Sequence, residues 1–265
     1  MILRRRAALN GEQLDQVDSR ILIQGIETQA ARNQFSTQSI GGGCGSRVTG
    51  QKRDWLDVII RFTINEKSYH PQERADVLEA ANSWAAKGGW LTVSYKPDRR
   101  LRVFMAQPAA EGDAASRSTY AITLRACGVP YWLQQNATVL YRQGVNDVQL
   151  TMANPGNAES EVEFQFHNTS GQTVNILSVN TGESVMTFSG LGLQSGETLT
   201  VTHADTGKAD VDVIEITGDG TRRSGRAKRT TGSNTRLKVS PGRHAVRFTA
   251  DHTGNLTIFC AGRWE

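Results

Sequence analysis

The sequence predicts a mainly β protein, with an N-terminal α+β domain at residues 1–134 and a C-terminal β-sandwich at residues 135–265. Alternation of apolar and polar residues, typical of half-buried strands, dominates the 265-residue chain. One segment, residues 71–88, carries apolar residues at helical spacing. Beyond the first domain, short alternating runs separated by turn residues recur about every ten residues, as in sandwiches.

The N-terminal domain is expected to be a β-rich barrel or sandwich with one packed helix. Its clearest strand is residues 54–64, in which the apolar side chains fall on one face. The helix begins at Pro71, which tolerates a missing N–H, and ends before Gly88 and Gly89. Its apolar stripe, which we interpret as core packing, consists of Val77, Leu78, Ala81, Trp84 and Ala85.

Three further strands are expected in this domain, at 90–95, 101–106 and from Tyr120 onwards. The turn chemistry of 96–100 predicts a hairpin between the first two. Residues 107–118 are interpreted as a mobile loop. Residues 28–50 are rich in Gln, Asn, Ser and Thr and include Gly41–Gly45, so we expect a flexible segment or a polar arm there.

The C-terminal domain shows no helical pattern. Its predicted strands are 145–151, 160–167, 173–179, 184–189, 197–203, 211–217, 235–240, 243–250 and 255–260.

The charge of the chain is unevenly divided. Its net charge is +4, from 30 basic and 26 acidic residues. Residues 1–133 hold 18 basic against 13 acidic side chains, whereas residues 134–265 hold 12 against 13. A nucleic-acid-binding protein usually concentrates more basic charge on one face. No apolar run is long enough to span a bilayer, and the first residues lack the apolar core of a secretory signal, so a soluble chain made without export is expected.

Cysteine usage argues against metal or disulfide scaffolds. Cys44, Cys127 and Cys260 are widely spaced and form no CxxC pair or Cys/His cluster. Cys127 and Cys260 lie at the ends of apolar strands and are expected to pack as small hydrophobic residues, while Cys44 lies in a glycine loop.

Two acidic groups could carry chemistry. Glu161 and Glu163 resemble a carboxylate pair, but side chains two apart on a strand point the same way, so we interpret them as a solvated face. The residues Asp205, Asp210, Asp212 and His203 could surround Ca²⁺, but EF-hand spacing is absent and a turn beside an edge strand is favoured. No HExxH, GxSxG or phosphate-loop motif occurs. We therefore predict no catalytic, metal-binding or cofactor-binding residues and no cofactor.

The sharpest local feature is a basic loop at residues 219–232. Its five cations are Arg222, Arg223, Arg226, Lys228 and Arg229. Nucleic-acid binding is disfavoured because no aromatic residue is interleaved to stack on bases. We interpret the loop as a solvated hairpin tip or as a contact to an acidic neighbouring chain, which makes these residues a candidate partner-contact site.

The order of these features resembles the distal tail proteins (Dit family) of siphovirus-type phages, over nearly the full length. The corresponding elements of the first domain are the strand at 53–64, the helix at 71–88, the hairpin at 90–106 and the closing motif Cys127-Gly128-Val129-Pro130-Tyr131-Trp132. In the second domain they are the turn Asn154-Pro155-Gly156-Asn157, the segment Asn168-Thr169-Ser170-Gly171, the strand at 196–201 and Leu237–Gly242. The polar 28–50 segment and the basic 219–232 loop depart from the family.

The resemblance implies an N-terminal ring-forming domain and a C-terminal galectin-like or carbohydrate-module-like sandwich. It also implies a non-enzymatic virion protein, made in the host cytoplasm and assembled as a hexameric ring at the tail tip. The implied partners are further copies of the chain, the tail tube protein, the tail-tip hub and receptor-binding proteins, with DNA only in transit and no membrane.

Two alternative functions stay open at this stage. The first is a carbohydrate-binding baseplate or adhesion module, although Trp264 is the only Trp of the second domain and no Tyr follows Tyr141. The second is a hydrolase whose catalytic residues are not recognisable.

Overall fold

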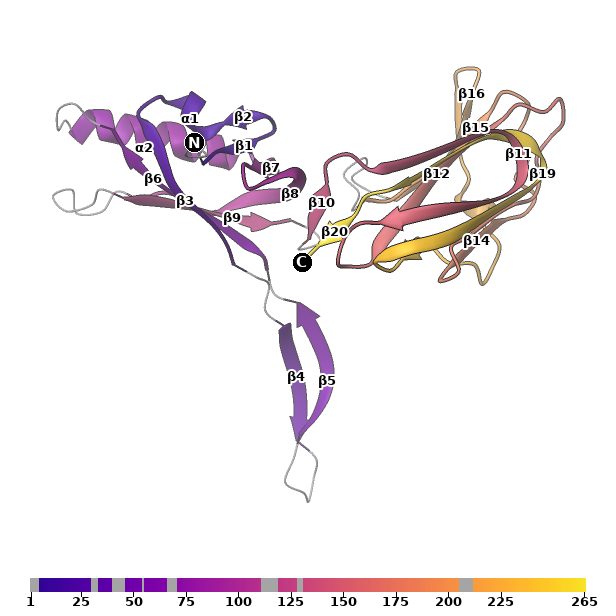
Figure 1. The fold of residues 1–265 in the computed structure, drawn as a ribbon, viewed down its shortest axis with the longest axis horizontal. Coiled ribbons are helices and arrows are strands. Elements are labelled where there is room, and N and C mark those ends of the chain that lie inside the picture. Colours follow the sequence, from indigo (N-terminus) through magenta and orange to yellow (C-terminus); the bar gives the residue numbers. More distant parts are fainter. Residues whose placement is uncertain are drawn as a thin grey trace. The chain divides into compact units, whose positions relative to one another are not determined.

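The computed structural model describes residues 5–29, 33–39, 46–53, 55–65, 71–110, 119–127, 131–204 and 212–265. The chain divides into two compact units, Met1–Trp132 together with Glu265, and Leu133–Trp264. Both are built from antiparallel strands, and the predicted mainly β class with an α+β first half and a β-sandwich second half is confirmed (Figure 1).

The first unit contains one curled antiparallel sheet. Its strands, in sheet order, are β2 (Glu12–Gln13), β1 (Ala7–Leu9), β7 (Gly89–Val93), β8 (Lys96–Gln107), β9 (Tyr120–Ala126), β6 (Asp57–Ile64) and β3 (Ile21–Gln29). The predicted strand at 54–64 is β6, and Leu56, Val58, Ile60 and Phe62 are buried as expected. The Thr28 hydroxyl, on the edge strand β3, lies 2.7 Å from the hydroxyl of Tyr95 in the β7–β8 turn.

Two helices accompany this sheet, the short α1 (Leu14–Val17) and α2 (Pro71–Ala86). The stripe predicted to be core is buried on α2 in all five positions, Val77, Leu78, Ala81, Trp84 and Ala85. The Trp84 indole N–H donates to the carbonyl of Glu12 at 2.9 Å, which ties the helix to β2. None of the described helices is both long and apolar enough to span a membrane.

The end of α2 depends on two glycines. Gly88 and Gly89 have φ of +58° and +119°, which L side chains rarely adopt. The Asn10 side chain donates to the Gly88 carbonyl and accepts from the Trp90 N–H, both at 2.9 Å. A Cβ on Gly89 would stand 2.3 Å from Asn10 Oδ1. The glycine pair that ends the helix therefore also leaves space for the Asn10 side chain and its two hydrogen bonds.

One sequence expectation for this unit needs correction. The β7–β8 turn is Ser94–Tyr95 rather than 96–100; the latter residues belong to β8, at an irregularity where the pairing register shifts between Leu91 and Val93. In the 28–50 segment, expected to be flexible or a polar arm, β4 (Asn33–Ser39) pairs with β5 (Ser46–Arg53) in a two-stranded antiparallel sheet. Gly41–Gly45, Cys44 and most of the predicted mobile loop at 107–118 lie outside the described residues.

The second unit is a sandwich held by two long, bent strands, β11 (Thr138–Asn154) and β19 (Gly242–Cys260), which pair side by side (Figure 1). The predicted strands 243–250 and 255–260 are thus one strand. Its residues 247–250 pair with β13 and its residues 254–260 pair with β12, so β19 passes from one layer to the other. Its other strands are β12 (Ser160–Asn168), β13 (Leu177–Asn180), β14 (Val185–Phe188), β15 (Thr198–Thr202), β16 (Val213–Gly218), β17 (Thr221–Ser224) and β18 (Leu237–Val239). Two short strands, β10 (Trp132–Gln134) and β20 (Arg263–Trp264), pair with each other.

The core of this unit lies between the layers. The rings of Phe164 on β12 and Phe188 on β14 meet edge to face with centroids 6.4 Å apart, and those of Phe166 and Phe248 lie 5.0 Å apart. Cys260 is buried beside them, as predicted, and burial raises the pKa of its thiol to about 12. Cys127 is instead exposed: it follows Ala126, the last residue of β9, and its backbone N–H donates to the Arg102 carbonyl of β8 at 2.8 Å.

Close packing at the bend of β19 leads to a stability prediction. A Cβ on Gly254 would stand 2.4 Å from the ring of Phe166 and 2.5 Å from the carbonyl of His167. We expect Gly254→Ala to lower the free energy of unfolding of the second unit by about 1–3 kcal/mol, because the clash involves backbone and a core ring. Urea denaturation measures this change.

Gly171→Ala is the matched control, because no atom lies within 4 Å of its Cβ position. It should change the free energy by less than about 0.5 kcal/mol. Equal effects of the two substitutions would contradict the packing seen at Gly254.

Candidate interaction surfaces

Glu161 and Glu163 form the centre of a buried charged cluster, so their interpretation as a solvated face is wrong. Their exposed fractions are 4% and 3%. The Glu161 carboxylate accepts from Arg236 Nη1 at 2.6 Å and from Arg263 Nη2 at 2.8 Å. Glu163 accepts the backbone N–H of His203 at 2.9 Å. The alternating pattern shows that these carboxylates share a face, but their covering partners are 40 to 102 residues away in sequence.

His203 and Asp212 complete this cluster. His203 is 1% exposed, with its ring Nδ1 3.7 Å from Asp212 Oδ1. Burial lowers the pKa of His203, while Glu161, Asp212 and Glu163 partly oppose the shift. Burial raises the pKa of Asp212, but hydrogen bonds from the Ala204 N–H and the Arg236 guanidinium outweigh it and hold that pKa below its ordinary value.

The cluster ties distant segments of the sandwich together. Arg236 lies just before β18, bonds both Asp212 and Glu161, and so joins the start of β16 to β12. Within the described ranges, no group of three or more His, Cys, Asp or Glu is placed to hold a metal ion. Asp205 and Asp210, considered for Ca²⁺, lie outside the described residues.

The basic loop, expected to be a solvated hairpin tip or a partner contact, begins with an exposed strand of a hairpin. Residues 221–224 form β17 and pair with β16. Residues Arg226–Lys228 then form a 3₁₀ turn, after which Arg229 bridges to Phe188 of β14. Periodicity in the sequence could not predict this strand, because its four residues are all polar and exposed and show no alternation of apolar and polar side chains.

Three of its five cations are used within the chain. Arg222 forms an ion pair with Glu215, Arg223 with Glu197, and Arg226 donates to the carbonyl of Asp212. Lys228 and Arg229 form no ion pair with another described residue, and Lys228 is exposed. The loop therefore offers fewer available cations to a partner than its composition indicates.

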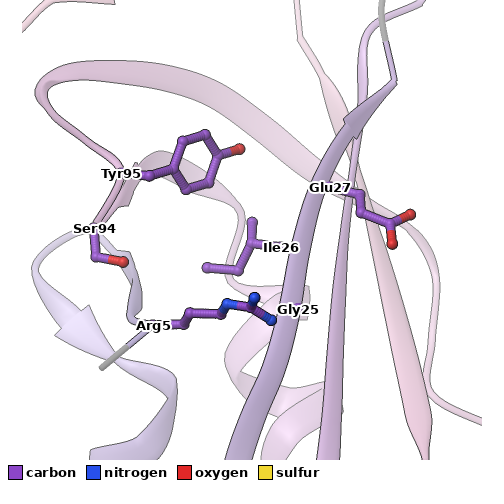
Figure 2. A pocket seen from close by; sticks show the side chains of 6 residues that line it. All are labelled: Arg5, Gly25, Ile26, Glu27, Ser94 and Tyr95. Atoms are coloured by element: carbon purple, nitrogen blue, oxygen red, sulfur yellow. The ribbon is translucent and has the colours of Figure 1, made fainter. Parts of the chain in front are cut away.

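A hollow of about 440 Å³ lies where the first sheet curls towards its own edge. Figure 2 shows Ile26 of β3 and Tyr95 of the β7–β8 turn beside it, with the Arg5 guanidinium below. The Glu27 carboxylate points away and accepts from Arg61 Nη1 at 2.8 Å. The Arg6 and Ser94 backbones bond near its base, where the Ser94 N–H donates to the Arg6 carbonyl at 3.0 Å.

Several large apolar side chains are exposed on strands or beside them. In the first unit they include Trp55, Tyr95 and Phe104, and in the second Val139 and Tyr141 on β11. β3 lies at one edge of the sheet of the first unit, and β17 lies at one edge of the sheet of the second. The outer backbone groups of these two strands pair with no other described strand. Trp264 is half-buried, and its ring lies 3.0 Å from where a Cβ of Gly262 would stand, so it packs on backbone.

The chain was compared with protein families, curated proteins and solved structures. No family model and no curated protein matches it. Among solved structures, it is similar to the Dit protein (gp 19.1) of phage SPP1, described as a paradigm of the hub adsorption apparatus of phages that infect Gram-positive bacteria. That match has a TM-score of 0.72 and 14% identity and covers 98% of this chain and 99% of the other. The chain therefore has the SPP1 Dit fold.

Two structures of the phage p2 baseplate in its activated conformation, with Sr and with Ca, align less closely. Each has a TM-score of 0.48 and 6% identity and covers 97% of this chain.

The charged cluster leads to a prediction about Arg263. Arg263→Met removes a guanidinium whose side chain is 9% exposed from a carboxylate that is 4% exposed. We expect a loss of about 3–5 kcal/mol in the free energy of unfolding of the second unit, because the buried Glu161 loses a partner. Lys238→Met breaks the exposed pair with Glu159 and should cost less than about 1 kcal/mol. Chemical denaturation distinguishes the two, and a loss for Arg263→Met as small as that for Lys238→Met would contradict a buried ion pair.

The lowered pKa of His203 predicts an acid-sensitive sandwich. The folded state favours the neutral imidazole, so unfolding takes up a proton once the pH falls below the ordinary His pKa of 6.5. The stability is fully present above that pH and declines as the pH falls towards the folded-state pKa. Thermal unfolding midpoints at about pH 7.5 and about pH 5.5 measure the decline.

His203→Gln should reduce this pH dependence, whatever it does to the midpoint at neutral pH. His252→Gln is the control, because His252 is only half-buried and lies outside the cluster. An unchanged pH dependence in His203→Gln would exclude His203 as its source.

Proposed function

We propose that this chain is a structural virion protein of a phage tail tip, which joins the tail tube to the tail-tip hub and the host-recognition apparatus. The observation that carries the proposal is the fold similarity to the SPP1 Dit protein over 98% of the chain. That protein is described as part of a hub adsorption apparatus, and the order of sequence motifs independently resembles the same family. In this role the chain makes and breaks no covalent bonds.

We assign ring formation to residues 1–134 and contacts outside the ring to the sandwich at 135–265. A closed ring needs one surface of each copy to contact a different surface of the next copy. The first unit offers an edge strand, a hollow beside it and exposed aromatic side chains such as Trp55 and Tyr95. These are features from which a repeated contact can be built, and a ring of six copies is the arrangement that we propose.

The excess of basic residues in the first half supports subunit contacts better than DNA binding. DNA in transit through a tail must not be held, and a strongly basic lining would bind phosphates tightly. We therefore assign the 18 basic against 13 acidic residues of 1–133 chiefly to contacts between copies. Salt screens exposed charges, so it should weaken the ring.

The basic loop is a second candidate contact. Because Arg222, Arg223 and Arg226 are engaged within the chain, we propose that Lys228 and Arg229 carry its contact with an acidic neighbouring protein.

Two measurements test the proposed function. Native mass spectrometry of the full chain should show an assembly of six copies, each of 29.0 kDa. The fraction of this assembly should fall in samples that were incubated at increasing salt concentration before transfer to the spectrometer buffer. Antibodies against the chain should label the tail tip of the phage particles that contain it. Labelling of another part of the particle, or absence of the chain from purified particles, would contradict the tail-tip role.

A further inference from the structure

The hollow beside β3 is enclosed by two contacts between the strand and the segments opposite it. The Thr28 hydroxyl lies 2.7 Å from the Tyr95 hydroxyl. Arg5 Nη1 lies 3.8 Å from the position that a Cβ of Gly25 would occupy. Gly25 and Thr28 are three positions apart on β3, which is about 10 Å along a strand. Residues 25–27, which line the hollow of about 440 Å³, belong to this interval.

The hollow carries a positive charge that its own lining does not neutralise. The Arg5 guanidinium faces the hollow and forms no ion pair within the described part of the chain (Figure 2). The lining also includes Glu27, but its carboxylate points away and pairs with Arg61 at 2.8 Å. The charge at this site therefore favours a negatively charged ligand.

A hydroxyl group is held beside this guanidinium. Ser94 Oγ accepts the backbone N–H of Arg6 at 3.0 Å, and the Ser94 N–H donates to the Arg6 carbonyl at 3.0 Å. These two bonds fix Ser94 next to Arg5, the preceding residue. The Ser94 hydroxyl hydrogen has no acceptor among the residues that the structure describes, so a ligand can accept it. A guanidinium and a hydroxyl together supply the donors that a carboxylate accepts.

The rest of the lining is apolar. Ile26 points into the hollow from β3, and the ring of Tyr95 lies across from it (Figure 2). Tyr95 is 48% exposed although its hydroxyl contacts Thr28, so its ring is the part that a ligand can cover. A carboxylate joined to an apolar group matches both parts of the lining. A phosphoryl group matches less well, because phosphate motifs are bound by several cations and Arg5 is the one cation of the described lining.

The two contacts that enclose the hollow select the end of a chain. A segment that continued along β3 past both contacts would displace the Arg5 side chain and separate the Thr28 and Tyr95 hydroxyls. A chain end enters from one side and leaves both contacts in place. Its last residues can also pair with the outer backbone groups of β3, which no other described strand uses.

We propose that this hollow binds the C-terminal end of a partner protein. The terminal carboxylate accepts hydrogen bonds from Arg5 and Ser94. The last side chain is apolar and packs between Ile26 and Tyr95. This inference goes beyond the proposed function, because it assigns the chemistry of one binding site and holds wherever the chain is placed in a particle.

Peptides that differ only in their terminal group test the proposal on the full chain. The probes are Gly-Thr-Val-Thr followed by Phe, Leu or Val, labelled with fluorescein at the N-terminus and ending in a carboxylate or in an amide. Fluorescence polarisation should show at least one acid binding about tenfold more tightly than its amide, because the amide lacks the charge that Arg5 pairs with. No acid binding with a Kd below about 1 mM, or equal binding of every acid and its amide, would overturn the proposal.

Arg5→Gln and Arg6→Gln are the matched variants. Each removes one exposed positive charge, but Arg5 lines the hollow and Arg6 does not. Arg5→Gln should bind the acid no more tightly than the amide, whereas Arg6→Gln should keep the preference. Tyr95→Ser should weaken both probes and keep their ratio, because the ring contacts the last side chain. Equal losses in Arg5→Gln and Arg6→Gln, with circular dichroism showing folded chains, would exclude Arg5 as the partner of the carboxylate.

Two further results would reject a chain end as the occupant. An amidated pentapeptide with an internal Asp that binds as tightly as the acids would mean that the hollow accepts an acidic side chain. Loss of the sixfold assembly in Arg5→Gln, with no peptide bound by the unchanged protein, would mean that a neighbouring copy fills the hollow. We expect Arg5→Gln to lose peptide binding and to keep its assembly.

Discussion

The sandwich depends on two strands that belong to both of its layers. β11 and β19 remain paired with each other while β19 changes partner from β13 to β12, so the layers cannot separate without breaking continuous strands. The bend requires a residue without a side chain where Phe166 and the His167 carbonyl approach, and Gly254 meets that need. The aromatic core between Phe166 and Phe248 forms directly across this bend.

The charged cluster on the other face of β12 follows from the same geometry. Once β12 is central in its layer, one set of alternating side chains fills the core and the other must be solvated or covered. Here Arg236, Arg263 and His203 cover Glu161 and Glu163. Paired buried charges cost desolvation energy, so they contribute more to a defined arrangement of the chain ends than to net stability. Two acidic residues at alternating positions of a strand can therefore have a structural role and need not be a catalytic pair.

The two units are equipped for different tasks. The first carries a curled sheet with an open edge, a hollow, one long helix and a separate two-stranded sheet, β4–β5. In the second, two long paired strands connect the layers, and three of the five cations of the basic loop are bonded to other residues of the chain. This contrast agrees with a protein in which one half assembles with its own copies and the other half presents a stable platform, as we propose for a tail-tip component.

The sequence alone determined the features that local periodicity controls. The β6 face, the stripe of α2 from Val77 to Ala85 and the glycine stop after it all follow from spacing that depends on backbone geometry. Only the tertiary structure decided which polar residues are buried, because Glu161 meets Arg236 and Arg263 from segments that no local pattern connects. It likewise decided that 243–260 is one bent strand, that β17 exists, and that the polar 33–53 region contains a hairpin. Pairing between distant strands sets these features, and an exposed strand with polar residues on both faces leaves no periodic trace in the sequence.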